Sequence, residues 1–321
     1  MQIAGQAKPP VGVVFDAFMG HSIDDALALA LLNGLAGKDE ARIASISVSN
    51  PSLKAAAYCD VIERFYASAT TGPAAMFFKG LPIGMAAGAG AAETPMLTAV
   101  LSQRDADGKP VYPTGIRELN ETADPATLIR NSLTAQYDQN AVIVATGPLT
   151  NLAKLLDLRD TKDLIARKVK YLVFSGGAFA QGQAAARKLF AEWPSSIISV
   201  WSEIGEALPF PASSIEKDFN WTPHHPVVDA YRAYHAMPYD APSAAMAAVL
   251  YAVRPNENYF KVSDPIGKHR HLTLDPEQKD RIIAAYIELA SAKPVARKFR
   301  PPKQDQKKED PKPPAPPTAA K

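Results

Sequence analysis

Short apolar runs alternate with longer helical patterns along most of the chain. Five runs are short, rich in β-branched residues and bounded by polar or glycine-containing turns, which is typical of strands buried in a parallel sheet. They are Val11–Phe15, Arg42–Val48, Ala141–Ala145, Val169–Phe174 and Ile197–Trp201. Strands that alternate with helices indicate an α/β fold.

The helical patterns fill the segments between these strands. Asp24 and Asp25 open an Ala/Leu run to Leu32 that is apolar on nearly every face and therefore predicts a buried helix. Further helices are predicted over Leu53–Tyr66, Asp124–Tyr137, Ala184–Trp193, Ala244–Val253 and Pro276–Ala292. The stretch Phe77–Pro95 is a Gly/Ala-rich loop without the glycine spacing of a phosphate-binding loop.

The first strand and helix bring three carboxylates close together in sequence. The strand Val11–Phe15 leads into a predicted loop, Asp16–Ser22, and Asp24 and Asp25 follow. Ligands of open α/β sheets bind at the carboxyl ends of strands, where these residues are expected. Two interpretations remain open: Ser22 and Asp25 form a helix capping box, or the carboxylates bind a hard cation such as Ca²⁺.

Composition separates a globular region from its ends. The 321 residues are 47% hydrophobic and 21% charged, enough for one large core, which we expect over residues 11–292 after an N-terminal extension, 1–10. Residues 293–321 hold eight of the 28 prolines and nine Lys/Arg against three Asp/Glu, which predicts a disordered basic tail. The globular part carries no basic patch typical of nucleic-acid binding.

Cysteine and hydropathy restrict the remaining classes. The single cysteine, Cys59, excludes a disulfide framework and lies in a helical pattern, so we expect a core thiol. No apolar run reaches the roughly 18 residues of a membrane span, and we predict no membrane partner. We expect a soluble cytoplasmic protein; a trimmed export signal, and hence a periplasmic protein, is the alternative. His224, His225 and His235 lack metal-ligand spacing and are read as surface or structural residues.

Several spaced motifs resemble the inosine/uridine-preferring nucleoside hydrolases. The stretch DAFMGHSIDDALAL is similar to the family's D-x-D, glycine loop and D-D-A-x-A signature. ATGPLTNLA, SGG after a strand, EWPSSIISVWSEIG and AAVLYAVRP follow in the family's order. The resemblance implies a doubly wound, Rossmann-like α/β fold with a mostly parallel sheet and helices on both faces.

The same resemblance implies a calcium site and a ribose contact. Carried over by position, Asp24 contacts a ribose hydroxyl, Asp25 is a metal ligand and Thr146 offers its backbone carbonyl to the metal. The family's catalytic base, which is also a ligand, is the second Asp of D-x-D; Phe18 stands there. Ala245 stands at the position of the last Asp ligand, five residues after Asp240.

Three further candidates and a second role for Asp24 complete the expected site. Asn50 follows the second strand as the family's ribose-binding Asn does, although a helix N-cap before Leu53 explains it equally well. Asp16 is a further candidate metal ligand, and Asp24 is the candidate surrogate base. Glu203 follows a strand end and is a candidate substrate contact or a surface residue.

The family resemblance implies hydrolysis of the N-glycosidic bond of purine and pyrimidine ribonucleosides by a Ca²⁺-activated water. The substitutions at Phe18 and Ala245 remove the base and two anionic ligands, and affinity for Ca²⁺ depends on ligand charge. The alternative is therefore a non-catalytic family member that binds a nucleoside-like ligand or a protein partner. Relatives are commonly dimers or tetramers, so a homo-oligomer is the expectation by analogy.

Overall fold

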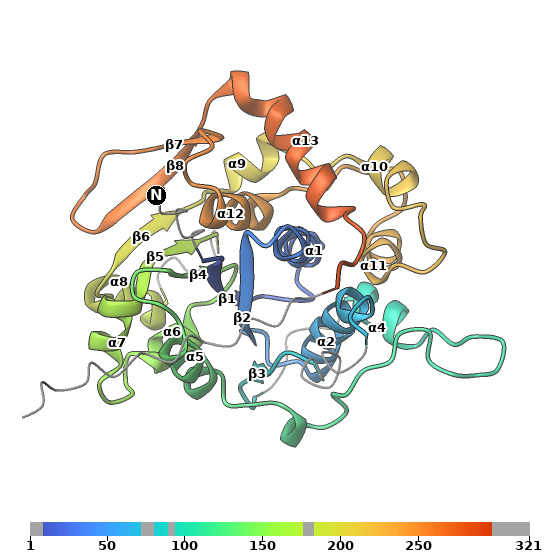
Figure 1. Ribbon diagram of the computed structural model, residues 1–321, viewed down its shortest axis with the longest axis horizontal. Helices are drawn as coiled ribbons and strands as arrows, with labels where there is room; N and C mark the ends of the chain where they lie inside the picture. The colour runs from blue at the N-terminus through green and yellow to red at the C-terminus, as the bar shows by residue number, and fades with distance from the viewer. Residues whose placement is uncertain (1–8, 72–79, 89–93, 176–182, 297–321) are drawn as a thin grey trace, which may run out of the picture.

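The computed structural model describes residues 9–71, 80–88, 94–175 and 183–296. One sheet runs through the middle of the molecule, with helices packed on both of its faces (Figure 1). Parts of the loop Phe77–Pro95 and most of the tail 293–321 lie outside the described residues. No helix within the described ranges is both long enough and apolar enough to cross a bilayer.

The sheet has eight strands in the order β3-β2-β1-β4-β5-β6-β8-β7. All neighbouring pairs are parallel except β7 and β8, which are antiparallel. The strands are β1 (Val11–Ala17), β2 (Ala41–Val48), β3 (Ile83–Met85), β4 (Ala141–Ala145), β5 (Val169–Phe174), β6 (Ser196–Ser199), β7 (Phe260–Val262) and β8 (His269–Leu274). The predicted mostly parallel, doubly wound α/β fold is confirmed.

Two helical layers cover the sheet. One face carries α1 (Asp24–Gly37), α2 (Leu53–Ala67), α4 (Pro95–Leu101), α9 (Ser202–Ala207), α10 (Ala212–Lys217), α11 (Pro226–Tyr234), α12 (Ala244–Val253) and α13 (Lys279–Ala290). The other carries α5 (Pro125–Thr134), α6 (Thr150–Leu155), α7 (Thr161–Lys168) and α8 (Ala184–Glu192). The described connections include the short 3-10 helices η1 (Leu119–Glu121) and η3 (Pro276–Gln278).

The central strand β1 contributes to both hydrophobic cores. Val13 and Phe15 belong to the core under α1 and α12, whereas Val14 belongs to the core under α5 and α6. This alternation follows from the period of two along a strand. The helix α1 is buried from Asp24 to Leu35, so its nearly uniform apolar sequence reflects complete enclosure rather than one core face.

Several element boundaries differ from the sequence predictions, for example the end of α5, which is Thr134 and not Tyr137. β1 continues through Asp16 to Ala17, because the chain keeps pairing with β2 there, so Asp16 lies in the strand and not in the loop. β6 ends at Ser199 rather than Trp201, which is the N-cap residue of α9. The segment predicted as a Gly/Ala-rich loop contains the strand β3, which pairs with β2. The composition of the segment gives no sign of this pairing.

Candidate functional site

Asp16 is held from the α6 side of the sheet. Its Oδ1 accepts hydrogen bonds from Ser47 Oγ (2.6 Å) and Asn151 Nδ2 (2.9 Å). Asn151 also donates to the carbonyl of Val48, which ties α6 to the ends of β1 and β2. Asp16 has the same strand parity as Val14, and so its side chain points away from the face that carries α1 and α12.

Asp24 lies at the first position of α1 and reaches the beginning of α12. Its Oδ2 accepts from the backbone N–H of Ala245 at 2.7 Å and its Oδ1 from that of Met246 at 3.2 Å. The backbone N–H of Asp24 donates to Ser22 Oγ, but the N-cap residue is Ile23 and the predicted Ser22–Asp25 capping box does not form. Both carboxylate oxygens of Asp24 therefore already have donors.

Asp25 lies beside the turn that follows β4. It forms a side-chain hydrogen bond with Thr146, while its Oδ1 is buried without a hydrogen-bond partner among the described residues. Asp16 Oδ2 is likewise buried without a hydrogen-bond partner among the described residues. The hydroxyl of Thr146 also accepts from the backbone N–H of Phe18 at 3.1 Å. The pair Asp25 and Thr146, expected together from the sequence, is thus brought together.

Phe18 covers the turn formed by Thr146 and Gly147. A β-carbon added at Gly147 would lie 2.4 Å from Cβ of Phe18 and 2.7 Å from its Cγ, so only glycine allows this approach. The ring of Phe18 stacks on that of His21 with centroids 4.7 Å apart. An apolar side chain therefore occupies the surroundings of the carbonyl that the family resemblance assigns to the metal.

Burial makes all three carboxylates weak acids. It raises the pKa of Asp16 to about 6, against the opposing hydrogen bonds of Ser47 and Asn151. It raises the pKa of Asp25 to about 7, against the opposing bond of Thr146. Burial, with an added contribution from the charge of Asp25, raises the pKa of Asp24 to about 8 although the α12 amides oppose the shift. The physical cause is the cost of placing charge in a low-dielectric interior.

The other predicted candidates have partners of their own or lie apart. Asn50 donates through Nδ2 to the carbonyl of Met19 at 3.2 Å, whereas Ser52 is the N-cap of α2. Asp240 accepts from the backbone N–H of Ala212 at 2.8 Å. Glu203 is exposed on α9, in a groove of about 440 Å³ formed with β8, and none of Asp16, Asp24 and Asp25 lines that groove.

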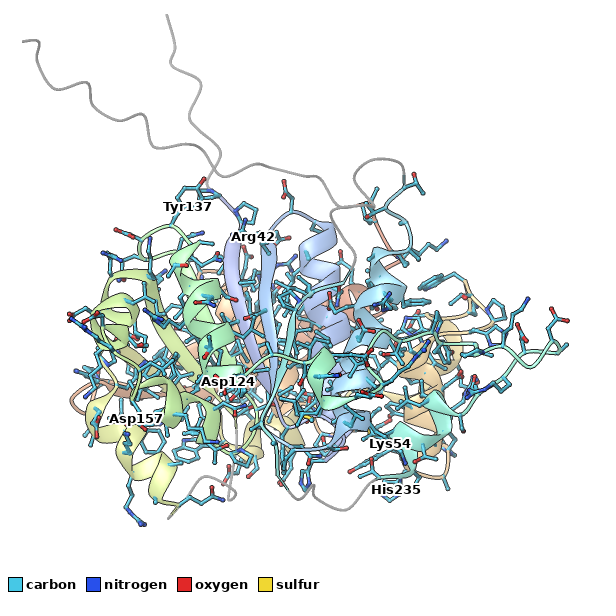
Figure 2. All side chains as sticks on the ribbon, turned by 90° about the horizontal axis from the view of Figure 1, so that it is seen from below. Arg42, Lys54, Asp124, Tyr137, Asp157 and His235 are labelled. Carbon is cyan, nitrogen blue, oxygen red and sulfur yellow. The ribbon has the colours of Figure 1, made fainter. Side chains whose placement is uncertain are left out.

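Two groups of residues at this end of the sheet had not been expected in the site from the sequence. Asn151 and Ser47 hold Asp16; the Asn belongs to the T-G-P-L-T-N motif, which offered a signal. The second group is the aromatic cluster, Tyr234, His235 and Tyr239, with ring centroids 5.2 to 6.3 Å apart. Burial raises the pKa of Tyr234, and the charge of Asp25 adds to this shift. Lys54, which follows β2, and His235 lie at the same end of the sheet, opposite Arg42 and Tyr137 (Figure 2).

These residues do not fit a calcium ion. Ca²⁺ takes about six to eight oxygen ligands, several of them carboxylates. Asp16 and Asp25 each retain an unbound carboxylate oxygen, but the alternation along β1 directs Asp16 to the opposite face. Asp24 is occupied by amide donors, and Phe18 and Ala245 supply no oxygen. In the described ranges, no three His, Cys, Asp or Glu residues are grouped so that they could hold a metal.

Solved structures share this architecture at low sequence identity. The type III effector protein XopQ, solved in complex with adenosine diphosphate ribose, superposes with a TM-score of 0.64 at 13% identity, over 89% of this chain and 96% of that one. The plant nucleoside hydrolase PpNRh1 superposes with a TM-score of 0.57 at 17% sequence identity, and the match covers 88% of this chain and 100% of that one. A purine-preferring ribonucleoside hydrolase from Gardnerella vaginalis superposes with a TM-score of 0.60 at 14% sequence identity, and the match covers 87% of this chain and 98% of that one.

Identities this low show the fold alone. No curated protein matches the sequence. The model of the family described as inosine-uridine preferring nucleoside hydrolase, however, matches residues 13–194, which is more than half of the chain. The order of the sequence motifs and the parallel sheet that carries them agree with this match. The chain therefore belongs to the inosine-uridine preferring nucleoside hydrolase family.

Proposed function

We propose that this chain is a non-catalytic member of its family, which retains the fold and a site for a nucleoside-like ligand without calcium-dependent hydrolysis. The observation that carries this proposal is the position of Phe18 on the Thr146–Gly147 turn. A phenyl ring supplies no oxygen ligand to Ca²⁺ and cannot take a proton from water. Without a bound metal ion, water keeps a pKa far above neutrality, so the nucleophile is lost as well.

The competing proposal is a hydrolase with altered metal handling. It is supported by two carboxylate oxygens without hydrogen-bond partners among the described residues, one on Asp25 and one on Asp16. Thr146, which bonds to Asp25, supports it as well. In this proposal Asp24 or Asp16 would act as the base. Asp24 supports it poorly, because both of its oxygens accept backbone hydrogen bonds and its side chain is enclosed.

The aromatic cluster of Tyr234, His235 and Tyr239 supports a planar ligand. Aromatic rings stack on nucleobases, and such contacts contribute roughly 1–3 kcal/mol per base. The charge of Asp25 contributes to the raised pKa of Tyr234, which favours a ligand whose base stacks on these rings and whose sugar points toward the carboxylates. A nucleoside-like small molecule therefore suits this end of the sheet better than an extended polymer.

Two measurements on the full chain test the proposal. Hydrolysis of inosine and uridine is followed with Ca²⁺ and with a chelator, for the wild type and for Asp25→Asn; we expect no turnover above the uncatalysed rate in any case. Calcium-dependent turnover that Asp25→Asn abolishes would establish the hydrolase instead. Calorimetric titration with inosine should give binding that Tyr234→Ala weakens about tenfold, while Tyr137→Ala at the opposite end has no effect.

A further inference from the structure

We infer that a hollow at the amino ends of β5, β6 and β8 binds a phosphate dianion, either free or as part of a phosphate monoester. The hollow has a volume of about 290 Å³, and Lys170, Lys268, Ser195 and Ser196 are among the residues that line it. It lies at the end of the sheet where Figure 2 shows Tyr137, opposite the candidate site. This inference goes beyond the proposed function and does not depend on it.

Three neighbouring strands place the two lysines on either side of one serine. Lys170 is the second residue of β5, Ser196 begins β6, and Lys268 directly precedes β8. Ser196 pairs with Tyr171 on one side, and the backbone N–H of Ile197 donates to the carbonyl of Lys268 on the other. Neighbouring strands lie about 4.8 Å apart, so the backbones of the two lysines are roughly 10 Å apart. Both long side chains can therefore reach an anion held at Ser196.

The side chains around the hollow have hydrogen-bond donors to spare. Lys268 donates to the carbonyl of Trp193 at 3.1 Å, which uses one of its three N–H donors. Lys170 lies 5.4 Å from the ring centroid of Tyr171 and forms no ion pair with any carboxylate that the structure describes. Ser195 Oγ accepts from Trp193 Nε1 at 2.9 Å, so its own O–H can still donate. Ammonium and hydroxyl groups are suitable donors to phosphate oxygens.

The charges of the two lysines are not compensated inside the hollow. No Asp or Glu of the described residues lines it. Two carboxylates stand beside the lining in sequence, but each pairs with another lysine: Asp138 with Lys168 at 2.7 Å and Glu192 with Lys162 at 2.8 Å. Like charges held near each other are destabilising, and a dianion bound between the two lysines of the hollow would relieve this repulsion.

The charge and size of the hollow suit a phosphate group. A phosphate monoester has its second pKa near 6 and therefore carries nearly two negative charges at neutral pH, which match the two ammonium groups. A water molecule takes up about 30 Å³ of liquid volume. A hollow of about 290 Å³ can thus hold a phosphate group together with several waters or with part of an ester group.

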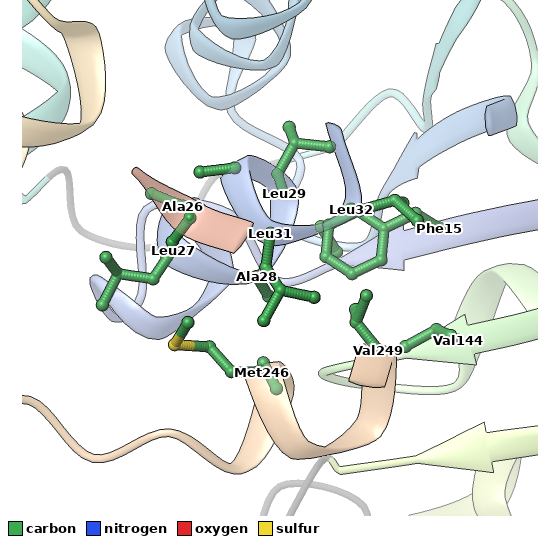
Figure 3. Packing of buried hydrophobic residues seen from close by; sticks show 14 of the residues in the cluster. Phe15, Ala26, Leu27, Ala28, Leu29, Leu31, Leu32, Val144, Met246 and Val249 are labelled. Carbon is green, nitrogen blue, oxygen red and sulfur yellow. The ribbon is translucent and has the colours of Figure 1, made fainter. Parts of the chain in front are cut away.

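The core of the molecule separates the hollow from the candidate site. Buried apolar side chains fill both faces of the sheet between its two ends. Figure 3 shows part of this core, where Val249 of α12 lies beside Val144 of β4. Burial of an unpaired charge among such side chains is very costly, so a phosphate in the hollow does not pass to the carboxylates. Its binding can therefore be measured independently of any turnover.

The test is calorimetric titration of the full chain with inorganic phosphate at low ionic strength, where charges are least screened. We expect one saturable site that Lys170→Gln and Lys268→Gln each weaken about tenfold, since each removes a charge-assisted hydrogen bond. Lys261→Gln is the matched control, because Lys261 lies on β7 of the same sheet but pairs with Asp275 at 2.9 Å. It should bind phosphate like the wild type. No saturable binding up to about 10 mM, or equal weakening in all three variants, overturns the inference.

Trp193 provides a readout that locates the bound anion. Its indole N–H donates to Ser195 at the hollow, whereas Trp201 follows the other end of β6. In ¹H–¹⁵N spectra, phosphate should shift the indole resonance of Trp193 and not that of Trp201, which Trp201→Phe assigns. A shift of Trp201 alone, or of neither resonance, overturns the inference. If Lys268→Gln does not fold, the exposed Lys170 still gives the decisive variant, since Lys170→Gln should reduce the shift of Trp193 at a fixed phosphate concentration.

A second probe distinguishes the two sources of the dianion. Glycerol 3-phosphate carries the same group as a monoester. A shift of the Trp193 resonance with both probes supports a phosphorylated ligand, and a shift with inorganic phosphate alone supports free phosphate. A shift that Lys170→Gln leaves unchanged with either probe overturns the inference.

Discussion

Replacement of Asp25 by asparagine is expected to stabilise the metal-free protein at alkaline pH but not in acid. The carboxyl is buried, one of its oxygens has no hydrogen-bond partner among the described residues, and burial raises its pKa from 3.8 to about 7. Because the folded pKa lies above the unfolded one, the favourable contribution of the neutral acid is complete below about pH 4. It is lost as the pH rises through about 7.

The magnitude follows from the two pKa values. A tenfold change in proton affinity corresponds to about 1.36 kcal/mol, so the difference between 3.8 and about 7 makes ionised Asp25 cost roughly 4 kcal/mol. Asparagine is neutral at every pH, but it weakens the hydrogen bond with Thr146, which costs about 1 kcal/mol. We expect a net gain of roughly 3 kcal/mol above about pH 8 and a loss of roughly 1 kcal/mol near pH 4.

The assay is urea unfolding of the wild type and Asp25→Asn in a chelator across this pH range. Asp218→Asn is the control, since Asp218 is exposed and its replacement should change stability little at any pH. A difference between the wild type and Asp25→Asn that stays constant with pH would refute the reasoning. It would show that the charge of Asp25 is compensated in the folded protein.

Three further predictions address other parts of the molecule. His225 is buried among the rings of Phe65, Phe219 and Trp221, and this burial lowers its pKa to about 3. The neutral imidazole stabilises the folded protein above about pH 6.5, and this contribution is lost as the pH falls toward 3. His225→Phe should therefore flatten the acid dependence of the melting temperature. Gly205→Ala should destabilise by more than about 2 kcal/mol, since the new Cβ would lie 2.6 Å from the backbone nitrogen of Ala244, whereas Gly88→Ala meets ordinary contacts and should unfold like the wild type. The double variant Phe18→Asp/Ala245→Asp places carboxylates at the two positions where the family has them, so it should bind Ca²⁺. At about 100 times the dissociation constant, Ca²⁺ should stabilise this variant by about 2.7 kcal/mol in thermal unfolding. The wild type should show no such shift.

The strands and helices that the sequence predicted best are those whose signal is local. β4, β5 and α12 have the predicted bounds, because their apolar runs are buried along nearly their whole length and are flanked by turns. β3 and the hairpin strands β7 and β8 were not predicted. Their short, mixed sequences form strands only because neighbouring strands offer hydrogen bonds.

The sequence named residues for the candidate site but did not indicate the contacts that each of them makes. It placed Asp16, Asp24 and Asp25 near the carboxyl ends of the central strands, and its family resemblance assigned Asp25 and the backbone carbonyl of Thr146 to one metal site. It did not indicate that Asp16 would be held by Asn151 on the other face. That outcome depends on the continuation of β1 through Ala17, because strand alternation then fixes the direction of the side chain.

The sequence by itself determined the fold class and the family, because these depend on residue type and on patterns within a few positions. Tertiary structure alone decided what the carboxylates of the candidate site bind. The partners of Asp24 are amides at the start of α12, which lie at the other end of the chain. Backbone N–H groups carry no sequence signal, and only the packing of α12 against α1 brings their positive end to this carboxylate.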